Sequence, residues 1–256
     1  MENVLIEVAD RVAVVTINRP AVRNAVDPAT ARELSEHFRA IDTDPGVDVA
    51  VLTGAGTSFC SGADLGAVAR GESFRIEEDG DGPLGVTRML TSKPVLAAIE
   101  GHAVAGGLEL ALWCDLRVAA ENAVFAVSNR RFDVPLIDMG TLRLPRIVGQ
   151  ARALEMILTG RSVGATEALT WGLATKVVPD GAALRATLDL AGEIASFPQT
   201  SLRSDRMGVY ESWARAADEA VVGEVRRGIE ALRSGDAIAG ARRFISGEGR
   251  SGEPLT

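Results

Sequence analysis

The sequence has few cysteines and no excess of basic residues. Only two of its 256 residues are cysteines, Cys60 and Cys114, and their separation matches neither a disulfide framework nor a metal-ligand motif. We therefore expect no metal site, and two small buried thiols in a reducing, cytoplasmic environment. Acidic residues outnumber basic ones by 35 to 27, for a formal net charge of −8, which argues against binding to nucleic acid or to an anionic membrane.

Long uncharged apolar runs are missing as well, so we expect no transmembrane helix. The first residues, MENVLIEVADRVAVV, contain an early acid and no basic region ahead of the apolar run, which is not typical of a signal peptide. No GxSxG pattern surrounds Ser61, and no histidine partner is identifiable for it. A serine or cysteine hydrolase is therefore disfavoured.

Hydrophobic residues make up 46 % of the chain, enough to build a sizeable core. The β-rich character of the first part gives way to a purely helical pattern near residue 195, which predicts a core over residues 1–195 and a C-terminal helical region over residues 196–256. Apolar, β-branched runs predict strands and 3.6-residue periodicity predicts helices. The expected strands are 4–8, 12–17, 49–53, 95–99, 115–119, 124–127 and 177–179, and the expected helices are 28–41, 85–91, 108–113, 142–148, 151–158, 166–170, 182–196, 200–209 and 211–233, with Asp27 or Thr30 as the cap of the first.

The most informative stretch is KPVLAAIEGHAVAGGLELALWCD, residues 93–115. An expected strand, a glycine turn and the start of a buried helix follow one another, a geometry that directs free backbone N–H groups at whatever lies above the turn. Glu109 lies three residues after Gly106, one helical turn on. Amides that hold an oxyanion beside a carboxyl group can polarise a carbonyl and move a proton next to it. A tight packing turn, with Glu109 as a cap, is the structural alternative.

A second stretch, GAGTSFCSGADL at residues 54–65, follows another expected strand. Together the two stretches resemble the enoyl-CoA hydratase/isomerase (crotonase) superfamily, and so do INRPAVRNAV near the start, GTLRLPRIVGQARALEMILTGR past the middle and WGLATKVVP after it. The resemblance implies an α/β fold, the crotonase spiral of ββα units, followed by a C-terminal helical region used in oligomer assembly. It also implies a homotrimer or a hexamer.

The resemblance further implies acyl-CoA chemistry through a thioester enolate, with the coenzyme A thioester as substrate and no separate cofactor. It assigns the oxyanion hole to the backbone N–H groups of Ser61 and Gly106, and proton transfer to Glu109. It assigns substrate and coenzyme A contacts to two loops, whose candidate residues are Val22, Arg23, Gly62, Ala63, Asp64 and Leu65. We expect Asp64 to hold its own turn, and Arg23 either meets a phosphate or is a solvated loop charge.

One position departs from the hydratase pattern. Asn129 falls where well-known hydratases carry a second glutamate, and an amide cannot act as a general acid or base near neutral pH. Asp138, in PLIDMGT, is the best substitute acid beside Glu109, or else a helix N-cap. Hydration of a 2-enoyl-CoA is the first function implied. Double-bond isomerisation with a single acid/base, another crotonase-type reaction, and a noncatalytic acyl-CoA binder are the alternatives.

Overall fold

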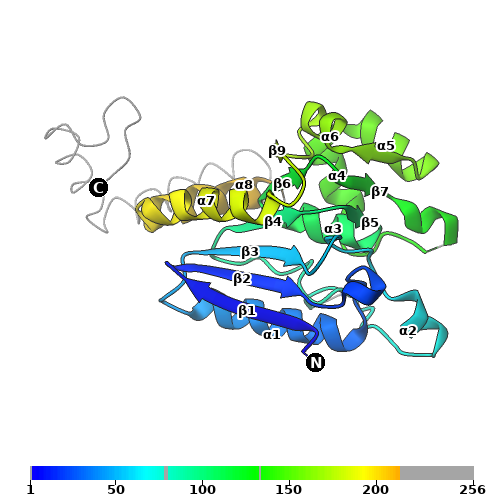
Figure 1. Ribbon diagram of the computed structural model, residues 1–256, viewed down its shortest axis with the longest axis horizontal. Helices are drawn as coiled ribbons and strands as arrows, with labels where there is room; N and C mark the ends of the chain where they lie inside the picture. Colours follow the sequence, from blue (N-terminus) through cyan, green and yellow to red (C-terminus); the bar gives the residue numbers. More distant parts are fainter. Residues whose placement is uncertain (1, 78–79, 133, 214–256) are drawn as a thin grey trace, which may run out of the picture.

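The computed structural model describes residues 2–77, 80–132 and 134–213, and its strands form two sheets (Figure 1). The larger sheet has six strands in the order β1-β2-β3-β4-β6-β9. Its first pair is an antiparallel hairpin, and every later pair is parallel. The strands are β1 (Val4–Ala9), β2 (Val12–Ile17), β3 (Val49–Gly54), β4 (Val95–Ile99), β6 (Leu116–Ala120) and β9 (Lys176–Val178).

The smaller sheet has three strands in the order β5-β7-β8: β5 (His102–Val104), β7 (Val124–Ala126) and β8 (Ser162–Gly164). Two successive turns of the chain each contribute one strand to the large sheet and the next to the small one: β4 is followed by β5, and β6 by β7. A single bridge between Cys60 and Ala103 extends the small sheet to the loop after β3. This alternation, with helices between the turns, is the expected spiral of ββα units.

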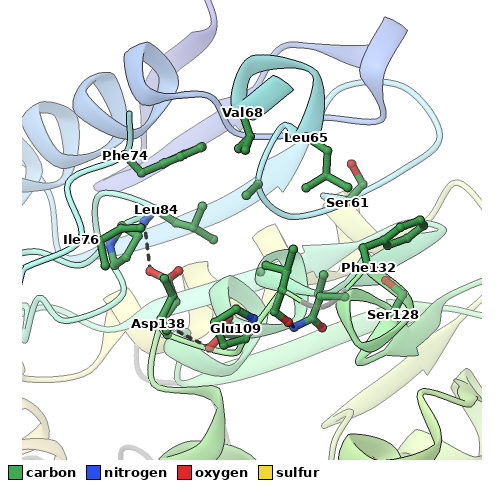
Figure 2. Close-up of a pocket in the computed structure, with 18 residues that line it drawn as sticks. Ser61, Leu65, Val68, Phe74, Ile76, Leu84, Glu109, Ser128, Phe132 and Asp138 are labelled. Atoms are coloured by element: carbon green, nitrogen blue, oxygen red, sulfur yellow. Dashed lines mark hydrogen bonds between the residues drawn. The ribbon is translucent and has the colours of Figure 1, made fainter. Parts of the chain in front are cut away.

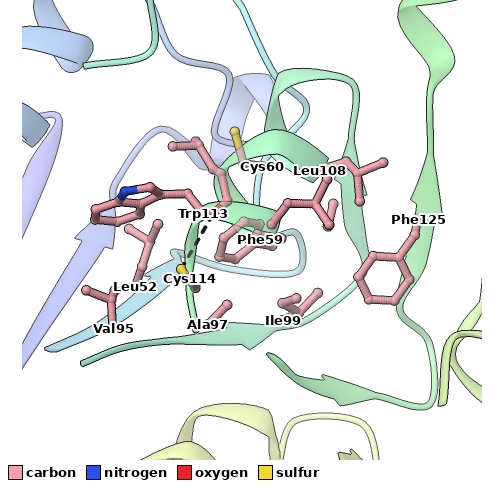
Figure 3. Packing of buried hydrophobic residues seen from close by; sticks show 14 of the residues in the cluster. Leu52, Phe59, Cys60, Val95, Ala97, Ile99, Leu108, Trp113, Cys114 and Phe125 are labelled. Atoms are coloured by element: carbon pink, nitrogen blue, oxygen red, sulfur yellow. Dashed lines mark hydrogen bonds between the residues drawn. The ribbon is translucent and has the colours of Figure 1, made fainter. Parts of the chain in front are cut away.

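Helices cover both faces of the large sheet, which is why its parallel strands are continuous apolar runs rather than alternating ones. In β3, Val49 and Val51 pack with α7, whereas Ala50 and Leu52 face the main core. Figure 3 shows that core around Phe59, Ile99, Leu108 and Trp113. The α-helices of the described residues are α1 (Pro28–Thr43), α2 (Leu65–Ala69), α3 (Gly106–Trp113), α4 (Gly140–Val148), α5 (Gln150–Thr159), α6 (Ala165–Trp171), α7 (Ala183–Ser196) and α8 (Gln199–Ser212), and the 3-10 helices are η1 (Pro20–Val22) and η2 (Ser128–Phe132).

Most expected elements are present with ends within a few residues. Asp27, not Thr30, caps α1, because its carboxylate accepts the Thr30 N–H at 2.8 Å. The helix expected over residues 85–91 is wrong: Gly85 has φ +88 and the segment forms turns, because Leu84 and Thr87 turn inward to bond Asp138. The short helix α2 was not expected. The helix expected over 211–233 lies outside the described residues except for its first three, and so does the whole C-terminal tail. The division at residue 195 stays a prediction.

The contact between α1 and α3 gives a test of the core. Phe38 is fully buried and meets Trp113 edge to face, with ring centroids 4.8 Å apart. We expect Phe38→Ala to lower the free energy of unfolding by about 3–5 kcal/mol, because it removes apolar contacts and leaves a cavity. Urea denaturation measures the change. The matched control is Phe197→Ala, whose ring is 40 % exposed and whose loss should cost far less. Equal costs for the two variants would contradict this view of the core.

Candidate active site

The first turn of α3 meets the loop after β3 backbone to backbone. A methyl group added at Gly107 would lie 2.0 Å from the Cys60 carbonyl oxygen, and one added at Gly62 would lie 2.7 Å from the Gly106 nitrogen. The turn between them needs Ala105 at φ 52, ψ −126, a backbone conformation that L residues rarely adopt. Strain at a residue with a side chain, next to two tight glycine contacts, marks this turn as built for a special purpose.

The structure corrects the expected pair of free amides. The Ser61 N–H donates to the Arg23 carbonyl at 3.1 Å, so it is occupied within the protein. The two free amides are those of Ala63 and Gly106, which have no acceptor among the described residues. They are neighbours, because a methyl group on Gly106 would lie 3.5 Å from the Ala63 nitrogen. Gly106 opens α3, so the positive end of the helix dipole adds to its N–H.

The Ala63 loop is fixed by bonds to a segment far away in the sequence. Val26 N–H donates to Gly62 O at 2.8 Å and Asp64 N–H donates to Val26 O at 2.8 Å, a parallel bridge that holds Ala63 between them. The Asp64 carboxylate accepts from Ala67 N–H at 3.1 Å and pairs with Arg19 at 3.0 Å. Asp64 therefore holds its turn, as expected, and these partners, together with backbone N–H donors, keep its pKa below the usual value although burial raises it.

Glu109 lies on α3 and is almost fully buried. Its Oε1 accepts two backbone N–H groups, and Figure 2 shows the one from Asp138. The donors are Asp138 at 2.9 Å and Gly140 at 2.8 Å. Gly140 lets the backbone approach this oxygen closely, because a methyl group there would lie 2.7 Å from it and would displace the Glu109 carboxyl. Both bonds fall on Oε1, which leaves Oε2 without a protein donor in the described part of the chain.

Burial raises the pKa of Glu109 to about 8, and the nearby Asp138 carboxyl adds to the rise against the two amide bonds and Arg143, which lower it. The group is thus mostly protonated at pH 7 and ionises within the range in which enzymes work. A carboxyl poised near neutral pH in a cavity is suited to general acid–base chemistry.

Asp138 lies beside Glu109 but is not a helix cap, because Met139 is the N-cap residue of α4 and no side chain caps that helix. The Asp138 carboxylate instead accepts the Leu84 N–H at 3.0 Å and the Thr87 hydroxyl. Burial raises its pKa as well, with these donors and two arginines opposing. Two neighbouring buried carboxyls disfavour each other's ionised form, so they titrate as a pair.

Asn129, in η2, lines the same cavity and is buried. Its Nδ2 donates to the Val134 carbonyl at 2.7 Å, and its Oδ1 is buried with no partner.

These residues surround one cavity of about 380 Å³ whose walls are largely apolar. Figure 2 shows Leu65, Val68, Phe74 and Ile76 opposite Glu109, with Phe132 at one side. Ser61, Ala63, Gly106, Glu109, Asn129 and Asp138 all line it. The cavity therefore joins two free amides and two carboxyls to a large apolar space.

The remaining expected contacts are partly absent. Val22 and Arg23 do not line this cavity, and both are exposed. Arg23 has φ 52, its carbonyl accepts the Ser61 N–H, and no acceptor for its side chain lies within the described residues. The resemblance implies that residues 66–85 help to line the acyl pocket, but the sequence does not single out Phe74 and Ile76 there, nor Phe132 elsewhere, since isolated apolar residues in an irregular segment carry no periodic signal.

Both cysteines are free and buried, as expected, and burial raises the pKa of the Cys60 thiol to about 12. No cluster of metal-ligating side chains occurs within the described residues. In the same part of the chain, no helix is long and apolar enough to cross a membrane.

Comparison with known proteins identifies the family. The family model for enoyl-CoA hydratase/isomerase matches residues 7–226. Enoyl-CoA hydratase EchA19 of Mycobacterium tuberculosis is 36 % identical over 94 % of this chain and 92 % of its own. An (E)-benzylidenesuccinyl-CoA hydratase of Thauera aromatica is 40 % identical over 79 % of this chain and 80 % of its own.

A solved structure agrees with this relationship. The crystal structure of enoyl-CoA hydratase EchA1 from Mycobacterium marinum superposes with a TM-score of 0.90 at 37 % identity, covering 95 % of this chain and 96 % of that one. With the spiral fold, the turn at α3 and the buried glutamate all in place, the chain belongs to the enoyl-CoA hydratase/isomerase family.

Proposed function

We propose that this protein is an acyl-CoA-processing enzyme that stabilises a thioester enolate, and that it hydrates a 2-enoyl-CoA. The observation that carries the proposal is the pair of free amides, Ala63 and Gly106, next to the buried Glu109 in one apolar cavity. Relatives named as hydratases, at 36 % and 40 % identity, support the choice of reaction.

The amides of Ala63 and Gly106 receive the thioester oxygen. As the enolate forms, negative charge moves onto that oxygen, and two fixed donors in a largely apolar cavity stabilise it strongly. The N-terminal end of α3 adds a favourable dipole. Only backbone groups are needed, so the Ser61 hydroxyl, which donates to Val22 O at 3.3 Å, is not a nucleophile.

Glu109 then moves the proton. Ionised Glu109 takes one hydrogen from a water molecule as the water oxygen bonds to C3 of the enoyl group, and the electrons of the C2–C3 double bond move toward the thioester. The same carboxyl returns that proton to C2, so the net change is the addition of water. The free Oε2 is the oxygen suited to this transfer, since Oε1 is held by two amides.

A second candidate reaction is isomerisation of a double bond in an enoyl-CoA. Asn129 supplies no second acid or base, and isomerisation needs only one group that removes a proton from C2 and returns it to C4. Glu109 meets that need. Asp138, whose carboxyl adjoins Glu109, is the other candidate for a proton-transfer role.

The apolar part of the cavity accepts the acyl group. Leu65, Val68, Phe74, Ile76 and Phe132 offer contacts to hydrocarbon and no charge to pair with a polar acyl group. We also propose a homotrimer or hexamer, a cytoplasmic location, coenzyme A contacts from the loop of Val22 and Arg23, and no cofactor beyond the substrate's own coenzyme A. Family membership supports these four proposals.

Glu109→Gln tests the proton carrier. The amide keeps an oxygen for the Asp138 and Gly140 N–H groups but carries no transferable proton, so we expect kcat to fall by about 10²–10⁴ with acyl-CoA affinity nearly unchanged. In the unsubstituted enzyme kcat/KM should rise with pH through about 8, because the raised pKa keeps the base protonated at lower pH. Turnover at the normal rate in the variant would remove Glu109 from the mechanism.

Asp138→Asn separates a charge effect from direct proton transfer. Asparagine still accepts from Leu84 N–H and Thr87 but removes the negative charge that helps to raise the Glu109 pKa. We expect the rise of kcat/KM to move to lower pH, with turnover retained; Arg88 and Arg143 also face the pair and stay unchanged. A profile that keeps its midpoint while kcat collapses would instead make Asp138 a proton donor or acceptor itself.

Ala63→Pro tests the corrected oxyanion assignment. Proline has no N–H, so we expect kcat/KM to fall by about 10²–10³, the cost of one such donor. Ser61→Ala is the control: it removes only the hydroxyl and should keep activity within a few-fold. Thermal unfolding checks that both variants fold. An active, folded Ala63→Pro variant, or an inactive Ser61→Ala variant, would count against the assignment.

A further inference from the structure

The Asn129 side chain, at the cavity wall, holds a single unsatisfied acceptor. The residue is 6 % exposed and lines the cavity, and its Oδ1 is buried without a hydrogen-bond partner. Leaving an amide oxygen buried and unpaired lowers stability, so its presence calls for a hydrogen-bond donor that offsets this cost. None of the described side chains supplies that ligand.

The orientation of this amide is fixed by its neighbour. Nδ2 donates to the Val134 carbonyl at 2.7 Å, and the Asn129 carbonyl accepts the Val134 N–H at 3.3 Å. Rotating the amide by half a turn would place Oδ1 against the Val134 oxygen, two acceptors facing each other. The unpaired group of this amide is therefore an acceptor, and whatever meets it must donate.

This requirement selects among the parts of the substrate. The thioester oxygen is an acceptor and belongs at the amides of Ala63 and Gly106. A hydrocarbon acyl chain donates nothing. A water molecule, or a hydroxyl group on C3 of the acyl chain, does donate.

We propose that Asn129 Oδ1 accepts a hydrogen bond from the water that adds to the enoyl group and, after addition, from the resulting C3 hydroxyl. The proposal rests on the proposed function above. The atoms balance: one hydrogen of the water passes through Glu109 to C2, its oxygen bonds to C3, and its second hydrogen stays on that oxygen, directed at Asn129. An amide serves well here because it holds this second hydrogen without removing it.

Asn129 is thus a positioning residue that favours hydration over isomerisation. A 3-enoyl thioester has no donor at C3, so it gains nothing from Oδ1. Asn129 stands where a second acid is absent, and it still makes the site specific for water or for a hydroxyl group.

The first experiment measures binding without turnover. In a Glu109→Gln background, isothermal titration gives the Kd of a 3-hydroxyacyl-CoA and of the saturated acyl-CoA of the same chain length. We expect the hydroxylated thioester to bind about tenfold more tightly, and Asn129→Leu in the same background to abolish the difference. Equal affinities before the second substitution would overturn the proposal.

The second experiment compares reactions. In the otherwise unsubstituted enzyme, Asn129→Leu should lower kcat for hydration of a 2-enoyl-CoA at least tenfold and leave isomerisation of the matching 3-enoyl-CoA within about threefold. Equal loss of both, in a folded variant, would assign Asn129 a merely structural role and overturn the proposal. An unsubstituted enzyme that turns over neither thioester would refute the proposed function. The difference in Kd from the first experiment would still test the role of Asn129 independently.

Asn129→Asp is the conservative control. Protonated aspartic acid can donate to Val134 O and still keep an unpaired acceptor, so the binding preference should return at low pH. Loss of the preference at every pH would contradict the fixed donor–acceptor arrangement.

Discussion

The site depends on one close approach, that of the loop after β3 to the first turn of α3. Gly107 lies against the Cys60 carbonyl and Gly62 against the Gly106 nitrogen, so closely that a Cβ at either glycine would clash. This contact brings the amides of Ala63 and Gly106 together, although they are 43 residues apart in the chain. The parallel strands β3 and β4 set the approach, because their registered pairing delivers both following loops to the same edge of the sheet.

The first turn of α3 also carries Glu109, and its surroundings set the protonation state of this carboxyl. Burying a permanently charged carboxylate at this position would cost too much free energy. The two amides that donate to Oε1 offset only part of this desolvation cost, which leaves the pKa of Glu109 near 8 rather than at its ordinary value. Met139, at φ 70, bends the chain so that both donors, one on either side of it, face a single oxygen. A rigid backbone holds the carboxyl while its second oxygen is left for chemistry, so positioning and reactivity are divided between the two oxygens of one group.

Much of this was accessible from the sequence, and the failures have physical causes. The strands at 12–17, 49–53 and 95–99 and the helix after Gly106 follow from continuous apolar runs and glycine stops, which are local signals. The assignment of the free amide to Ala63 rather than Ser61 does not follow from local signals. It depends on the long-range pairing of this loop with the segment from Arg23 to Val26, which occupies the Ser61 N–H and leaves the Ala63 N–H free. The helix expected over 85–91 failed for the same reason: bonds from Leu84 and Thr87 to Asp138, more than fifty residues away, outweigh local propensity.

The amide at 129 and the carboxyl at 138 are best understood as one electrostatic arrangement. Asp138 already raises the pKa of Glu109, and a third carboxyl at 129 would stand in the same apolar cavity, whose described lining residues include no cation. Like charges in low dielectric disfavour one another steeply, so such a group would hold Glu109 protonated at still higher pH and weaken it as a base. A neutral acceptor at 129 avoids that cost and still binds water. With Asp138 in place, an amide at 129 is therefore compatible with hydration.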